Sequence, residues 1–122
     1  MNYTGKTTET QRRNDLLKSI RKELVKQSNT DFKTILNYPE IKRYYFGLKY
    51  ITTSNKTICE TLHIPVEAGT RYKAELEDNL TLVTSIDKFQ CPFTKEYVQF
   101  LSTNPLEFER LSTSKNKQLK LL

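Results

Sequence analysis

The sequence predicts an α+β fold that is mostly helical, and three observations support this class. Apolar residues recur at spacings of three and four along residues 9–27, which is typical of an amphipathic helix. Two later segments each begin with a proline and continue with helical spacing. From Leu80 onward the pattern changes to alternation, which indicates strands. At 122 residues the chain has the size of one ordinary domain with one modest core.

The composition is that of a folded protein and argues against a membrane-spanning or secreted one. Hydrophobic residues make up 36% of the chain and charged residues 28%, but seven Tyr and six Phe supply material for a core. No apolar stretch is long enough to span a bilayer, and residues 1–10 lack the apolar centre of a secretory signal. We therefore expect a cytoplasmic protein with no membrane partner.

The N-terminal part, residues 9–37, is predicted to be one amphipathic helix followed by a short bridge, and residues 1–8 are expected to be disordered. The apolar stripe of the helix consists of Leu16, Leu17, Ile20, Leu24 and Val25. This stripe packs either on the same chain or on a second copy in a homodimer through residues 9–27, and the sequence leaves both open. In the bridge, Phe32, Ile35 and Leu36 are expected to join the core.

Three further helices are predicted between residues 39 and 78. The first starts at Pro39, where a proline suits the first turn, and runs to about Ile51. The second spans about residues 55–62, because Ser54 offers an N-cap hydroxyl. After a tight turn, the third runs from Pro65 to about Asp78. It ends at Asn79, a residue type that tolerates a left-handed backbone.

A β-hairpin and a short helix complete the predicted fold. Residues 80–87 alternate, residues 97–102 are rich in β-forming side chains, and residues 88–96 form a long tip between the two strands. The aromatics of the tip either form a binding surface or fold back onto the core. Asn104 and Pro105 then predict a helix to about Leu111, so that residues 104–122 form a short helix and a flexible tail.

The order helix, short helix, tight turn, longer helix and hairpin resembles the winged helix-turn-helix family over about residues 39–103. The residues that carry the resemblance are Ile58-Cys59-Glu60-Thr61-Leu62-His63-Ile64-Pro65, followed by the stripe Ala68, Tyr72 and Leu76. The resemblance implies a winged-helix domain over residues 38–103 with an added N-terminal amphipathic helix and a short C-terminal helix. It also implies that residues 65–78 form a recognition helix, which enters the major groove of double-stranded DNA while the hairpin acts as a wing. His63 departs from the pattern because glycine is common at this position of the turn. Gly69 departs from it because glycine within a helix costs about 1 kcal/mol relative to alanine.

Helical geometry selects the residues that face DNA. If the apolar stripe points inward, the opposite side presents Glu67, Thr70, Arg71 and Ala74 to base edges. Arg71 is the best candidate for base recognition because a guanidinium donates two bonds to guanine. Phosphate contacts are expected from residues beside this helix, at the start of the preceding helix and on the wing: Lys73, Lys56, Thr57, Lys88 and Lys95.

The charge distribution supports nucleic acid as a partner but leaves an alternative open. The net charge is +6, and residues 1–30 carry seven basic and three acidic side chains. Residues 64–104, in contrast, carry four basic and six acidic side chains. The prediction is a DNA-binding protein, either a transcriptional regulator or a mobile-element or replication accessory factor. The alternative is a winged-helix module that binds another protein and not DNA.

No combination of residues predicts catalysis. The chain has one His and three Gly, so neither a Ser-His-Asp arrangement nor a glycine-rich phosphate loop can be drawn from it. Cys59 and Cys91 are far apart and lack metal-ligand spacing with His63. We expect a protein that is not an enzyme and has no cofactor and no metal.

The C-terminal residues suggest a second kind of partner. Residues Gln118, Leu119, Leu121 and Leu122 resemble the short peptide by which bacterial replication proteins bind their sliding clamp. This resemblance rests on five residues, and an apolar end that packs locally is the simpler interpretation.

Overall fold

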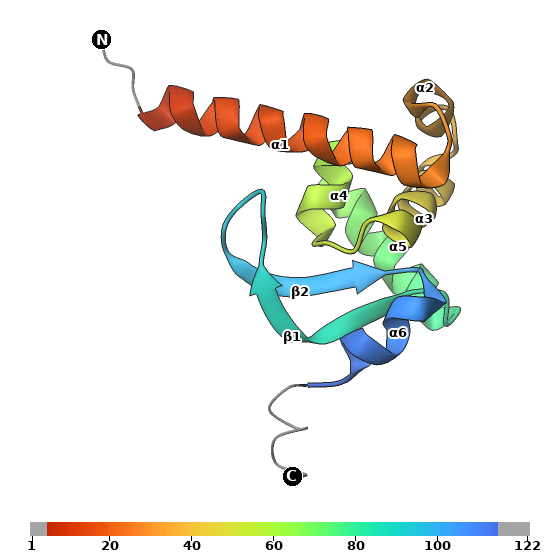
Figure 1. Ribbon diagram of the computed structural model, residues 1–122. Helices are drawn as coiled ribbons and strands as arrows, with labels where there is room; N and C mark the ends of the chain where they lie inside the picture. Colours follow the sequence, from red (N-terminus) through yellow and green to blue (C-terminus); the bar gives the residue numbers. More distant parts are fainter. Residues whose placement is uncertain (1–4, 115–122) are drawn as a thin grey trace.

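The computed structural model describes residues 5–114, with side chains for residues 8–114, and shows an α+β, mostly helical chain (Figure 1). The elements in order are α1 (Gly5–Ser28), α2 (Phe32–Leu36), α3 (Glu40–Tyr50), α4 (Asn55–Leu62), α5 (Val66–Asp78), β1 (Val83–Gln90), β2 (Tyr97–Ser102) and α6 (Pro105–Ser112). The described strands form one antiparallel hairpin. The prediction of an α+β, mostly helical fold is therefore confirmed.

The long helix α1 lies along α3 and α4 (Figure 1). It begins at Gly5, so residues 5–8 belong to the helix and the expectation that they are disordered is wrong. Leu24 is fully buried, and the other four residues of the apolar stripe are half-buried. Arg21 connects α1 to α4, because its Nε donates to the Thr61 carbonyl at the end of α4 over 3.0 Å. Part of the stripe therefore packs on its own chain.

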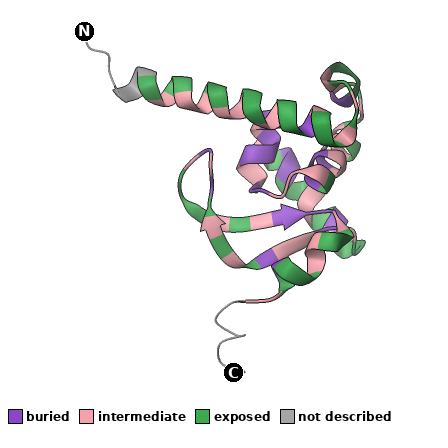
Figure 2. Cartoon of the chain, viewed as in Figure 1, coloured by how far each residue is buried: buried purple, intermediate pink, exposed green. Residues whose placement is uncertain are grey.

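The core forms where α3, α4 and α5 meet (Figure 2). Tyr44 and Leu48 from α3 are fully buried there, together with Ile58 and Leu62 from α4. The bridge after α1 is itself a short helix, α2, and Asp31 caps it by accepting a bond from the Thr34 amide. Ile35 of α2 is fully buried, whereas Phe32 and Leu36 are half-buried.

The hairpin differs from the prediction in its bounds. β1 begins at Val83 and continues to Gln90, so that three residues assigned to the tip belong to the strand. The pairing is interrupted between Thr84 and Lys88, where one strand bulges. Ser85 is buried at this point, and its Oγ accepts the Phe100 amide over 2.8 Å. A side chain thus replaces the missing backbone partner. α6 packs against both strands.

The helix α5 ends at Asp78 with Asn79 as its C-cap, as predicted, but Asn79 is not the left-handed residue. Asn79 keeps an ordinary backbone with φ −84°, and the left-handed residue is Leu80, with φ 62°. The Thr81 amide then donates to the Leu76 carbonyl over 2.9 Å, which closes the end of the helix. The Leu80 side chain is 84% exposed. The chain therefore holds a branched residue in a strained conformation without burying its side chain.

Replacing Leu80 with glycine is expected to stabilise the fold. A left-handed residue with a Cβ costs about 1–2 kcal/mol, and glycine avoids this cost. We expect Leu80→Gly to raise the free energy of unfolding by about 1 kcal/mol in urea denaturation. Leu80→Ala is the matched control, since it removes the exposed side chain but keeps the strain. Equal stabilities of the two variants would contradict this account.

The crossing of α4 and α5 depends on Gly69. A Cβ added at this position would lie 2.3 Å from Cys59 Sγ and 2.9 Å from Asn55 Oδ1. Tyr44 lies beneath the crossing, and its hydroxyl donates to the same Asn55 Oδ1 over 2.7 Å. Gly69 lowers the intrinsic stability of α5 relative to alanine, but it also sets how closely α4 and α5 approach each other.

Gly69→Ala is expected to destabilise the protein, although glycine to alanine within a helix is ordinarily favourable by about 1 kcal/mol. The added methyl group overpacks the crossing, and we expect a loss of about 1–3 kcal/mol in the free energy of unfolding. In Cys59→Ala the sulfur that meets the methyl group is gone, so adding Gly69→Ala to that variant should cost less. A stabilised Gly69→Ala single variant would show that the crossing is not tight.

Candidate nucleic-acid interface

The side of α5 opposite the core is open to solvent. Ala68 and Leu76 are buried, and the Tyr72 hydroxyl donates to Glu40 Oε1 over 2.8 Å, which fixes the rotation of α5 on α3. The four residues predicted to face base edges are exposed: Glu67, Thr70, Arg71 and Ala74. Sequence periodicity thus predicted the exposed side of this helix correctly.

A groove of about 410 Å³ runs between α5 and the hairpin. Thr70 and Lys73 line it from α5, Lys56 lines it from the first turn of α4, and Glu96 and Gln99 line it from the hairpin. The structure therefore brings two of the predicted phosphate-binding lysines together beside the exposed side of α5. Arg71 does not line this groove but lies on the neighbouring exposed side.

The lysines of the groove have acidic neighbours. Lys56 Nζ lies 3.4 Å from Glu60 Oε2, and Lys73 Nζ lies 3.7 Å from Glu77 Oε1. Both pairs are one helical turn apart and partly exposed, so each contributes only a few tenths of a kcal/mol. Arg71 forms no ion pair within residues 8–114. Of Arg71, Lys56 and Lys73, Arg71 is thus the one that forms no ion pair with a described carboxylate.

Thr57 is not available to a phosphate. Its side chain is fully buried, and its backbone amide donates to the capping Ser54 Oγ over 3.2 Å. The Thr57 hydroxyl in turn accepts a hydrogen bond from the Ser54 hydroxyl, and it also contacts the sulfur of Cys91. The prediction that Thr57 binds a phosphate is therefore wrong, because this amide and this hydroxyl are used to cap α4 and to hold the hairpin.

The tip of the hairpin folds back onto α1. The guanidinium of Arg12 donates to the carbonyls of Pro92 and Phe93, each over 2.8 Å. Phe93 is only 6% exposed, and the Arg13 guanidinium lies 4.7 Å from the centre of its ring. Lys88 and Lys95, the predicted wing contacts, remain exposed. Of the two alternatives for the tip aromatics, a binding surface or folding back, Phe93 follows the second. The Phe89 ring packs beside the ring of Phe100.

Arg12 is further ordered by its own helix. Its guanidinium binds both carboxylate oxygens of Glu9, at 2.9 and 2.7 Å. This hydrogen bond is the main cause that lowers the pKa of Glu9 to about 2. The carboxylate therefore stays charged at any physiological pH and keeps the arginine directed at the hairpin.

Cys91 attaches the hairpin to the start of α4. Its sulfur lies 3.1 Å from Ser54 Oγ and 3.3 Å from Thr57 Oγ1, and the Thr94 amide donates to it over 3.4 Å. Burial raises the pKa of this thiol, but the bonds from these three residues outweigh burial and lower the pKa to about 7. Cys59 differs, because burial raises the pKa of its thiol to about 12.

Two features of this region were missed in the sequence. Arg12 contacts residues 80 positions away, and nothing local to either segment marks such a contact. For Cys91 the sequence shows only the lack of metal-ligand spacing, which says nothing of its burial or of its hydroxyl partners. The only local signal was Ser54, whose role as an N-cap was predicted and is confirmed.

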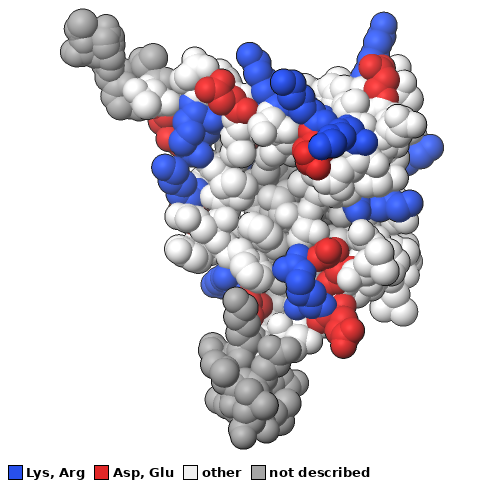
Figure 3. All heavy atoms as spheres, viewed as in Figure 1, with Lys and Arg blue, Asp and Glu red and all other residues white. Residues whose placement is uncertain are grey.

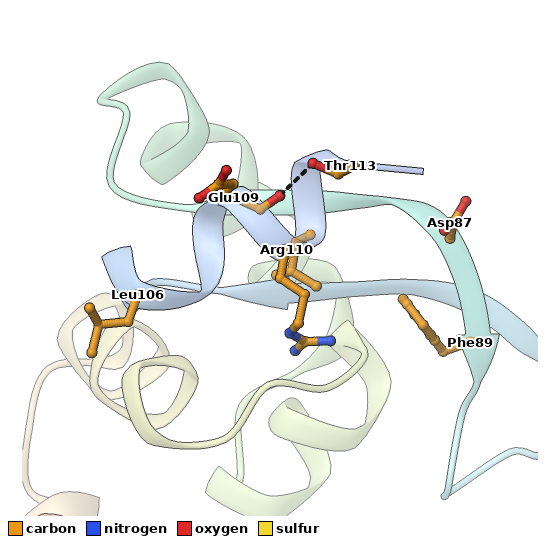
Figure 4. A pocket seen from close by; sticks show the side chains of 7 residues that line it. Asp87, Phe89, Leu106, Glu109, Arg110 and Thr113 are labelled. Carbon is orange, nitrogen blue, oxygen red and sulfur yellow. Dashed lines mark hydrogen bonds between the residues drawn. The ribbon is translucent and has the colours of Figure 1, made fainter. Parts of the chain in front are cut away.

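Another hollow, of about 640 Å³, lies between β1 and α6 (Figure 4). Asp87 and Phe89 line it from β1, and Leu106 and Arg110 line it from α6. None of the residues predicted to bind DNA lies in it. The residues predicted to bind a clamp protein, Gln118, Leu119, Leu121 and Leu122, lie outside the described part of the chain.

The chain matches no family model, no curated protein and no solved structure in the three comparisons made with known proteins. Within the described residues, no helix combines the length and the apolar character needed to cross a membrane. In the same part of the chain, no group of three His, Cys, Asp or Glu side chains is placed to hold a metal ion.

The lowered pKa of Cys91 predicts how stability depends on pH. The folded thiol, with a pKa of about 7, loses its proton before the unfolded thiol, whose ordinary value is 9.0. Raising the pH from 7 to 9 therefore favours the folded state, and this contribution is lost as the pH falls through 7. We expect the free energy of unfolding to rise over this window more steeply in the wild type than in Cys91→Ala. Cys59, whose pKa is raised from 9.0 to about 12, lowers the stability of both proteins equally as the pH approaches 9 and cancels in the comparison. Parallel curves for the two proteins would refute the assignment.

Proposed function

We propose that this chain is a winged-helix protein that binds double-stranded DNA, with α5 in the major groove and the hairpin beside it. The observation that carries the proposal is the continuity of two surfaces. The exposed side of α5, with Arg71, adjoins a groove in which Lys56 and Lys73 face the hairpin. The order α3, α4, α5, β1, β2 is the order that a winged helix-turn-helix requires.

The four exposed residues of α5 that were predicted to face base edges each have a role in this proposal. Arg71 donates two bonds to O6 and N7 of a guanine, and Glu67 accepts a bond from the amino group of a cytosine. Thr70 and Ala74 are short enough to contact the methyl group of a thymine. These contacts would determine sequence preference, since they reach base edges and not the backbone.

The lysines position the protein on the duplex. Lys56 and Lys73 exchange their weak ion pairs for phosphates, which costs little because each pair is partly exposed. Lys88 and Lys95 on the hairpin contact the flanking backbone. The attachment of the tip to α1 gives the hairpin a fixed position, which reduces the conformational entropy lost on binding. We propose a cytoplasmic role without catalysis, as a transcriptional regulator or as an accessory factor of replication or of a mobile element.

Salt-dependent binding to DNA tests the proposal. Fluorescence anisotropy with a labelled random 30-base-pair duplex should show affinity that falls steeply between about 50 and 200 mM salt. We expect Lys73→Ala to reduce the slope of log affinity against log salt by about one. At a site selected from random sequence, Arg71→Ala should lose about 1–3 kcal/mol of preference for one base.

The control for this experiment is Lys33→Ala, which removes an exposed lysine from α2 and should leave both affinity and slope unchanged. An equal effect of Lys33→Ala and Lys73→Ala would mean that DNA binds through net charge alone. An absence of wild-type binding even at 50 mM salt would reject DNA as the partner. The alternative, a winged-helix module that binds a protein, would then be preferred.

A further inference from the structure

A groove of about 650 Å³ is lined by residues of α1 and by Phe32 of α2. Its floor is formed by Val25, Phe32 and the stem of Arg21, and most of its surface is apolar. Lys18, Lys22 and Lys26 line its rim. Figure 3 shows basic side chains gathered over α1, which is the helix that supplies the rim.

The three rim lysines are spaced four residues apart, so they lie on one side of α1 and are all exposed. Like charges at this spacing destabilise a helix by a few tenths of a kcal/mol per pair. Within the described residues, none of the three forms an ion pair. This distinguishes them from Lys56 and Lys73, each of which has a carboxylate one turn away. Asp15 also lines the groove, where it accepts a bond from Gln11, so the lining holds the three lysines and Arg21 against one carboxylate and is net positive.

The floor of the groove is held in place from below. The Arg21 guanidinium lies 5.4 Å from the centre of the Phe32 ring. The same guanidinium donates to the carbonyls of Thr61, over 3.0 Å, and of Glu60, over 3.3 Å. Phe32 is thus packed against a side chain that is itself fixed to α4. A ligand would find this surface already formed and would pay little to order it.

We propose that this groove binds an acidic segment of a partner protein that carries a bulky apolar side chain. The apolar side chain packs on Val25 and Phe32, while carboxylates of the segment pair with Lys18, Lys22 and Lys26. A protein segment explains both halves of the surface. A nucleic-acid backbone would use the lysines but leave the apolar floor uncovered.

Two other occupants are disfavoured by charge. The chain's own residues 115–122 contain three lysines and no acidic residue, so they would be repelled by the rim. A second copy bound about a two-fold axis would place the same lysines opposite one another. Because the groove belongs to α1 and α2 and the proposed DNA contacts belong to α5, α4 and the hairpin, the two activities are separable. The protein would then connect DNA to an acidic partner.

The test uses the full chain, labelled with ¹⁵N, and a synthetic 16-residue helical peptide rich in Glu with Leu and Phe one turn apart. We expect saturable chemical-shift changes at residues 18–26 and at Phe32. The double variant Lys18→Glu/Lys22→Glu should weaken binding about tenfold or more. Lys42→Glu/Lys49→Glu is the matched control, since it makes the same change of charge on α3 and should bind as the wild type. Circular dichroism would establish that both variants are folded.

Two further probes separate the outcomes. A peptide with the same acids but with Leu and Phe replaced by Ser should bind at least about tenfold more weakly; equal binding would show charge attraction only and overturn the proposal. A random duplex that shifts the same resonances of residues 18–26 and displaces the peptide would instead assign this surface to nucleic acid. No shift with the acidic peptide would also overturn the proposal, whatever the result for DNA at α5.

Discussion

The close crossing of α4 and α5 is the constraint on which the rest of the structure depends. Gly69 lets the two helices meet at Cys59 without a Cβ between them, and Tyr44 closes the space below through its bond to Asn55. A bulkier residue at either position would push α5 outward, and Tyr72 would then lose Glu40. The angle at which the exposed side of α5 is presented thus depends on the absence of one methyl group.

The hairpin is fixed by a second set of contacts, at the opposite end from its connection to α5. Arg12 holds the tip through two carbonyls, and Cys91, at the start of the same tip, contacts the hydroxyls of Ser54 and Thr57. These contacts make α1 part of the same structural unit as the hairpin. Cys91 is buried among polar groups because its sulfur is a hydrogen-bond partner of Ser54 and Thr57.

Much of this architecture follows from local sequence. The spacing of apolar residues predicted the helices and the exposed side of α5, and proline and serine at the helix starts predicted where several helices begin. These signals act over one or two helical turns, so they can be recognised in the local sequence. The start of α1 and the left-handed residue after α5 were misplaced. Nothing in residues 5–8 forms an apolar pattern, and a leucine rarely takes the left-handed position that Leu80 occupies. The burial of Thr57 and the contact of Arg12 with the hairpin depend on packing between distant segments, which periodicity does not report.

The bond from Arg12 to the hairpin tip also bears on where the protein can be cut. Residues 38–103 contain the helices and strands of the winged-helix resemblance, but the tip of that unit is held by a residue of the N-terminal helix. A fragment that starts at the first residue of α3 would lose the buried Leu24 and Ile35 from the core, and it would also lose the anchor of its hairpin. The smallest autonomous piece with this hairpin geometry therefore includes α1 from before Arg12. Homologous chains that lack such a helix would need another means of holding the hairpin.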